Sequence, residues 1–163
     1  MSNRRLWIWL TLAAVLLVAG TIFFFSSQSS DDSSELSNAI IEPPLTLFEP
    51  EYPTMPPAQK ASLLADVSFV VRKLAHFSIF ALLGFCLMAH VTLVRWGKSR
   101  RVSGAIAWLA AVLYACSDEL HQMYAIGRSP ELRDVCIDSG GALCGILLMA
   151  ACSALAIKKR RQT

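Results

Sequence analysis

The residues of this sequence that could carry out chemistry gather next to long apolar segments. Asp118 and His121 lie in the stretch 117–122, directly after the uncharged apolar run 102–116, and His76 lies just inside another apolar segment. Imidazole titrates close to neutral pH and a carboxylate can orient it, so these three residues are candidates for acid–base catalysis. Ionisable groups at such a depth in a membrane are costly unless they are paired or reach water, so they suggest a functional site by default.

Further polar residues accompany these three along the chain. Cations mixed with carboxylates at a membrane boundary suit an anionic lipid headgroup or a lipid-linked precursor of the cell envelope. The candidate binding residues are Arg72, Lys73, Glu119, Gln122, Arg128, Arg133, Asp134 and Asp138. The cations of this region equal its carboxylates in number, so an ion-pair network that only fastens helices together is a competing interpretation.

Metal binding and nucleophilic catalysis have less support. His76, His121 and the carboxylates could supply three or four ligands, but no H-x-x-x-H or H-E-x-x-H spacing occurs. Ser117, Ser139 and Cys116 are candidate nucleophiles only because they lie near the other polar residues. We therefore predict neither a metal site nor another cofactor from the sequence.

The elements that must position these residues are apolar enough to cross a membrane. The chain has 163 residues, of which 55% are hydrophobic. A helix that crosses about 30 Å of hydrocarbon needs roughly 20 residues. We predict a single all-α membrane domain over residues 1–163, with four transmembrane helices at 6–25, 74–94, 102–124 and 135–157.

Basic residues set the predicted orientation. They cluster before the first apolar segment, in the link 95–101 and in the tail 158–161, which should therefore face the cytoplasm together with both termini. Residues 26–66 should then form a long, mostly irregular extracytoplasmic connection between the first two helices. The first segment is longer than a signal-peptide core and no A-x-A site follows it, so we expect it to stay uncleaved. The net charge of +3 is explained by this topology, and we expect no nucleic-acid partner.

Local signals predict where some helices begin. Residues 32–35 could cap a short helix that runs toward Ile40, although a solvated linker is an equal alternative. Pro57 could open a helix that continues into the second apolar segment. Ser129 followed by Pro130 is a good N-cap and first residue for the fourth helix.

Helical periodicity predicts which polar side chains face the bundle. Asp118 and Gln122 share one face with His121 beside them, whereas Glu119 is rotated by about 100°. We therefore expect Asp118 to face inward more surely than Glu119.

The fourth helix has a stripe of small and acidic residues. Asp134, Asp138, Gly141 and Gly145 fall on one face, and Gly-x-x-x-Gly is a close-packing pattern of membrane helices. The two aspartates should therefore face a neighbouring helix. Together, the second, third and fourth helices should bring the polar residues to one site that opens toward the outer side of the membrane.

These residues resemble the VanZ-like family in order, spacing and membrane context. The matching series is Arg72-Lys73-x-x-His76-Phe77, Ser117-Asp118-Glu119-x-His121-Gln122, Gly127-Arg128 and Arg133-Asp134-Val135-x-x-Asp138-x-x-Gly141-x-x-x-Gly145. The resemblance implies a multi-pass protein of the bacterial cytoplasmic membrane, and the founding member of the family is associated with low-level resistance to the glycopeptide teicoplanin. It implies no known reaction. Many members have Asn where this chain has Asp138.

Two functions follow as expectations. The protein could lower teicoplanin susceptibility by binding or altering envelope lipids or precursors through the outward-facing site. Alternatively, it could be a membrane-embedded enzyme that acts on a lipid-linked or phosphate-bearing substrate, with His76 or His121 as acid or base and Asp118 as the orienting carboxylate. The sequence leaves open whether the protein is an enzyme and whether it forms oligomers.

Overall fold

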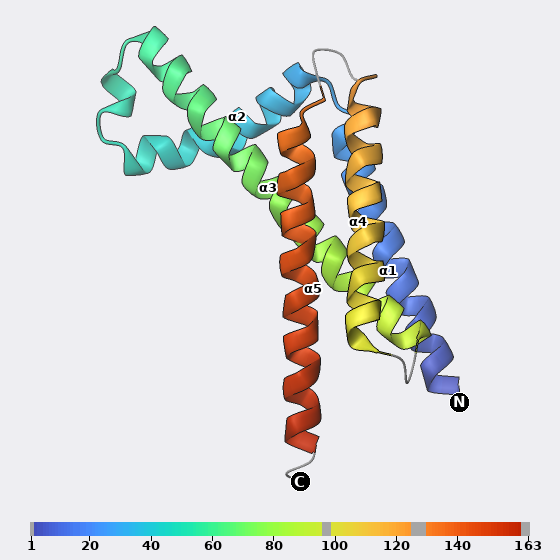
Figure 1. The fold of residues 1–163 in the computed structure, drawn as a ribbon. Coiled ribbons are helices and arrows are strands. Elements are labelled where there is room, and N and C mark those ends of the chain that lie inside the picture. The colour runs from blue at the N-terminus through green and yellow to red at the C-terminus, as the bar shows by residue number, and fades with distance from the viewer. Residues whose placement is uncertain (1, 96–98, 125–129, 161–163) are drawn as a thin grey trace.

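The chain folds into helices only, over the residues that the structure describes (Figure 1). The computed structural model describes residues 2–95, 99–124 and 130–160. Its elements are α1 (Ser2–Ser26), α2 (Ser30–Phe48), the single 3₁₀ turn η1 (Tyr52–Thr54), α3 (Pro57–Val94), α4 (Arg100–Gln122) and α5 (Leu132–Arg160). The predicted all-α class is confirmed.

Three of the helices are long and apolar enough to cross a membrane. They are α1, α3 and α5. The predicted span over 102–124 coincides with α4. This helix is long enough, but it is not apolar enough over that length to count among the three. A pair of arginines at its start and the polar residues 117–122 at its end shorten its apolar part. α4 nevertheless packs beside α3 and α5, and the first residues of α1 and the last of α5 lie at the same end of the molecule (Figure 1).

The connection between α1 and α3 is mostly helical, so the prediction of a largely irregular segment is wrong. α2 begins two residues before the predicted cap, because the Ser29 hydroxyl accepts a hydrogen bond from the Asp32 N–H at 3.1 Å and donates one to its carboxylate at 2.7 Å. The helix continues through Pro43 and Pro44 to Phe48. It packs against α3, where Ser68 donates a hydrogen bond to Asn38 at 2.8 Å.

The start of α3 is confirmed and that of α5 is not. α3 begins at Pro57 and has 38 residues, so at 1.5 Å per residue it is roughly 57 Å long. It therefore extends well beyond the bundle on the side of α2 (Figure 1). α5 begins at Leu132, so Pro130, the predicted first residue, and Glu131 precede the helix. Ser129, the predicted N-cap, is outside the described residues.

Glycines allow α3 and α5 to approach closely, as the stripe on the fourth helix predicts. A Cβ atom on Gly145 would overlap the Ala81 carbonyl, and one on Gly141 would overlap the Phe77 carbonyl. On the other helix, Gly84 meets the Ala142 backbone in the same way. Small residues at these positions let two backbones touch, which fixes the register of α5 along α3.

The apolar core joins α1 to this helix pair. Val18 and Ile22 of α1 pack with Phe80 and Leu83 of α3, and Ala115 of α4 completes the cluster. At the opposite end of the bundle, the Thr11 hydroxyl lies 3.1 Å from Nδ1 of His90, which links α1 to α3 there. These contacts hold the ends of α1 and α4 against the part of α3 that carries His76.

Candidate functional site

Three of the predicted residues meet where α3, α4 and α5 come together. His76, Asp118 and Asp138 each offer a donor atom, and these atoms lie within 4.8 Å of one another. The closest pair is His76 Nδ1 and Asp138 Oδ1 at 3.6 Å. Asp138 is fully buried and Asp118 is 3% exposed. The residues are far apart in the sequence, so helix packing creates the cluster.

Asp118 is held by side chains from two helices. Its Oδ2 accepts hydrogen bonds from the Ser26 hydroxyl at 2.9 Å and from the Gln122 amide at 3.0 Å. Gln122 lies one turn further along α4, as the periodicity predicts, and both residues are buried. The expectation that Asp118 points inward is confirmed, and Ser26 supplies a partner that the sequence reasoning missed.

Glu119, whose orientation helical periodicity leaves open, is also buried. It is 4% exposed, and its Oε2 accepts a hydrogen bond from the Glu131 backbone N–H at 2.9 Å. Glu131 lies just before α5 begins, so the chain that leads into α5 covers the side of α4 that carries Glu119. Glu119 therefore contacts the beginning of α5 instead of the His76 cluster.

An ion pair connects α3 to the beginning of α5. Lys73 Nζ lies 2.5 Å from Asp134 Oδ2, and both side chains are partly buried. One residue earlier in α3, the Arg72 guanidinium donates a hydrogen bond to the Ser34 hydroxyl at 3.2 Å. Among the described residues, Arg72 forms no ion pair.

His121 lies on the side of α4 that faces α1. Its ring stacks on Phe23 with a centroid separation of 4.3 Å, and its Nε2 is 3.0 Å from the Ser27 hydroxyl. Within the described residues it does not share the cluster of His76 and Asp138. The two candidate histidines thus have different surroundings.

The remaining predicted cations are peripheral or outside the described residues. Arg133 is exposed, pairs with Glu131 at 2.7 Å and lies over the Phe69 ring. Arg128 lies outside the described residues.

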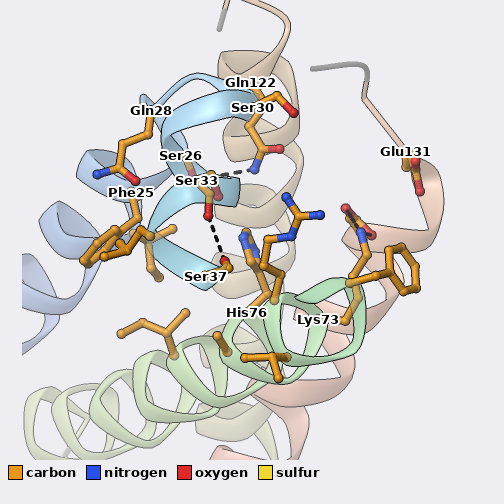
Figure 2. A pocket seen from close by; sticks show the side chains of 18 of the residues that line it. Phe25, Ser26, Gln28, Ser30, Ser33, Ser37, Lys73, His76, Gln122 and Glu131 are labelled. Atoms are coloured by element: carbon orange, nitrogen blue, oxygen red, sulfur yellow. Dashed lines mark hydrogen bonds and ion pairs between the residues drawn. The ribbon is translucent and has the colours of Figure 1, made fainter. Parts of the chain in front are cut away.

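A pocket of about 530 Å³ adjoins these polar groups. In Figure 2, Lys73 and His76 of α3 lie on one side and Ser33 and Ser37 of α2 on another, with Gln122 near the end of α4. Apolar side chains from α1, α2 and α3 complete its lining, namely Ile22, Phe25, Leu36, Ile40, Phe69, Val71 and Ile79. A cavity of this size, apolar with a few polar groups, is typical of a small-molecule or headgroup site.

The serines of α2 are the main site residues that sequence reasoning missed. Ser30, Ser33 and Ser37 line the pocket. Their spacing of three and four residues places them on one face of a helix. That periodic signal is present in the sequence but has meaning only if the segment is helical.

The arrangement can do two kinds of chemistry. His76 lines the pocket and has a buried carboxylate at its Nδ1, which is the pairing that orients an imidazole for proton transfer. The hydroxyls of α2 and the Arg72 guanidinium can donate hydrogen bonds to an anion.

Comparison with known proteins supports the resemblance seen in the sequence. Neither the comparison with curated proteins nor that with solved structures gives a match. The model of the VanZ/LLP1 family matches residues 11–153, which include α2, α3, α4 and the larger part of α1 and α5. With most of its length matched and three helices that could span a membrane, the chain belongs to the VanZ/LLP1 family.

Proposed function

We propose that this VanZ-like protein binds the headgroup of an anionic envelope lipid or lipid-linked precursor in the pocket between α1, α2 and α3. It would do so as a multi-pass protein of the bacterial cytoplasmic membrane, with the pocket open to the outer side. Binding would reduce the exposure of that lipid or precursor to glycopeptides and so lower susceptibility to teicoplanin.

The environment of Arg72 is the observation that carries this proposal. Its guanidinium lines the pocket, and its one side-chain hydrogen bond among the described residues goes to the Ser34 hydroxyl at 3.2 Å. The carboxylates at the same pocket, Asp134 and Glu131, already hold Lys73 and Arg133. Arg72 is therefore available for a phosphate, and a planar guanidinium can bind phosphate through two parallel hydrogen bonds.

The apolar part of the pocket suits the rest of an amphiphile. Ile22 and Phe25 near the end of α1 and Ile40 of α2 line it, and Ile40 is 62% exposed. An acyl or isoprenoid chain could continue from a headgroup at Arg72 along these residues. Burial of such a chain stabilises binding in proportion to the apolar area removed from water.

Arg72→Gln and Arg101→Gln form a matched pair for testing this function. Arg101 is exposed at the start of α4, away from the pocket. Each variant and the wild type are expressed to equal levels in a susceptible bacterium, and the inhibitory concentration of teicoplanin is measured. Phospholipid that stays with the purified proteins is identified by native mass spectrometry.

We expect the wild type and Arg101→Gln to raise the inhibitory concentration and to retain lipid, and Arg72→Gln to do neither. If the wild type leaves teicoplanin susceptibility unchanged, the role in resistance is wrong. If Arg72→Gln retains as much lipid as the wild type, the pocket is not the binding site.

The pairing of His76 with Asp138 favours a second candidate function, a membrane-embedded enzyme. In that case the pocket would bind a lipid-linked or phosphate-bearing substrate, and His76 would act as acid or base with Asp138 and Asp118 beside it. Purified protein is incubated with lipid phosphates and released phosphate is measured. Turnover by the wild type, lost in His76→Gln while lipid binding remains, would support the enzyme, and absence of turnover in the wild type would count against it.

A further inference from the structure

The cluster of His76, Asp118 and Asp138 contains two carboxylates, and among the described residues its ion-pair contact is the one between His76 and Asp138. Both oxygens of Asp138 and Nδ1 of His76 are buried without a hydrogen-bond partner among the described residues. Among the described residues, Asp138 has one ion-pair contact, with His76 at 3.6 Å. A buried carboxylate is strongly disfavoured unless it is hydrogen-bonded, paired with a cation or bound to a metal.

Among the described residues, neither of the nearby cations Arg72 and Lys73 forms an ion pair with a carboxylate of the cluster. Lys73 is paired with Asp134, and Arg72 donates to the Ser34 hydroxyl. Even a protonated His76 would balance only one of the two carboxylates. A divalent cation could therefore neutralise the two carboxylates of the cluster.

The hydrogen bonds of Asp118 are those expected around a metal ligand. Ser26 and Gln122 both donate to Oδ2, at 2.9 and 3.0 Å. Among the described residues, Oδ1 has no such donor and is available to bind. Metal-ligating carboxylates are commonly oriented by hydrogen bonds of this kind.

We propose that His76, Asp118 and Asp138 bind a divalent transition-metal ion, with Zn²⁺ as the expected occupant. An imidazole and two carboxylates are suitable zinc ligands, and three protein ligands leave a position for water or another ligand. Donor atoms around tetrahedral zinc are about 3.4 Å apart. The donors here lie within 4.8 Å, and the His76–Asp138 pair at 3.6 Å is already close to that separation.

The open position would be next to the lipid pocket, because His76 belongs to both sites. No short spacing motif reveals the three ligands, since α3, α4 and α5 each contribute one. The inference goes beyond the proposed lipid function and does not rest on it, because zinc binding is measured without lipid substrate or antibiotic.

Purified full-length protein provides the test. The protein in detergent is treated with a chelator, dialysed against micromolar zinc with excess magnesium, freed of unbound metal, and analysed for metal content. His76→Gln and Asp138→Asn remove a ligand each. His90→Gln is the matched control, because His90 is on the same helix but contacts Thr11 at the other end of the bundle.

We expect about one zinc per chain in the wild type and His90→Gln, and at least about tenfold weaker binding in His76→Gln and Asp138→Asn. Zinc should also raise the Tm of the wild type, a measurement that needs no variant to fold. A wild type that binds no zinc and has an unchanged Tm would overturn the proposal. Equal zinc binding by the wild type and a well-folded His76→Gln would overturn it too, because the ion would then lie elsewhere.

Discussion

His76 Nδ1 lies 3.6 Å from Oδ1 of Asp138, and this contact joins α3 to α5 at the polar end of the helix bundle. No hydrogen-bond donor reaches the Asp138 carboxylate among the described residues, although the side chain is fully buried. The pair is therefore central both to the stability of the helix interface and to any chemistry in the adjoining pocket.

The first prediction concerns this pair as a source of stability. In chelator, His76→Ala should lower the free energy of unfolding by about 3 kcal/mol, because it leaves the Asp138 carboxylate buried without a partner. Asp138→Asn in the same background should recover most of that loss. Unfolding of the purified variants in mixed detergent measures both values, and equal losses in the single and double variants would contradict the argument.

A second prediction tests the close approach of α3 and α5. Gly145→Ala would place a Cβ on the Ala81 carbonyl, whereas the nearest atom to a Cβ on Gly140 is Phe77 Cε2 at 4.0 Å. Overpacking of this kind costs about 1–3 kcal/mol or more, so Gly145→Ala should reduce the Tm sharply and Gly140→Ala should not. Similar Tm values for the two variants would mean that the helices are further apart.

The Lys73–Asp134 ion pair provides a third prediction, through exchange of the two charges. Lys73→Asp and Asp134→Lys should each destabilise the protein, because each places like charges side by side at the α3–α5 interface. The double variant should recover part of the loss, with a coupling energy of about 1 kcal/mol in a double-mutant cycle. Additive effects of the two substitutions would show that the pair is not formed.

A fourth prediction separates the two histidines. His121 stacks on Phe23 of α1, and aromatic pairs contribute roughly 1 kcal/mol beyond their area. His121→Phe keeps an aromatic ring and should be more stable than His121→Ala, while both should bind zinc as the wild type does. Thermal melting and metal content measure this, and loss of zinc in His121→Phe would place His121 in the metal site.

The fifth prediction concerns the side of the membrane reached by each end of α4. In a variant with all native cysteines replaced by alanine, single cysteines are introduced at Asp31, Ser99, Tyr124 and Lys158. If α4 crosses the membrane, an impermeant maleimide should label the cysteines at 31 and 124 in intact cells, and those at 99 and 158 only after permeabilisation. Labelling of positions 99 and 124 from the same side would contradict the four-span topology.

Much of the helical framework could be predicted from the sequence because local rules govern it. Apolar length identified α1, α3 and α5, Pro57 marked the start of α3, and the glycine stripe identified the face of α5 that meets α3. The helical extent of α2 was underestimated, because Pro43 and Pro44 suggested an irregular segment although the helix accommodates both. The period of α4 left the burial of Glu119 open, because that burial depends on Glu131, which precedes a different helix.

The sequence by itself determined which residues could do chemistry and that they lie near one end of apolar helices, since side-chain type and helical period are local properties. Only the tertiary structure decided that His76 meets Asp118 and Asp138, while His121 turns to α1. The physical reason is that distances between helices depend on backbone contacts such as Gly145 against Ala81, which set the crossing and register of α5 on α3. No spacing along a single helix contains that information.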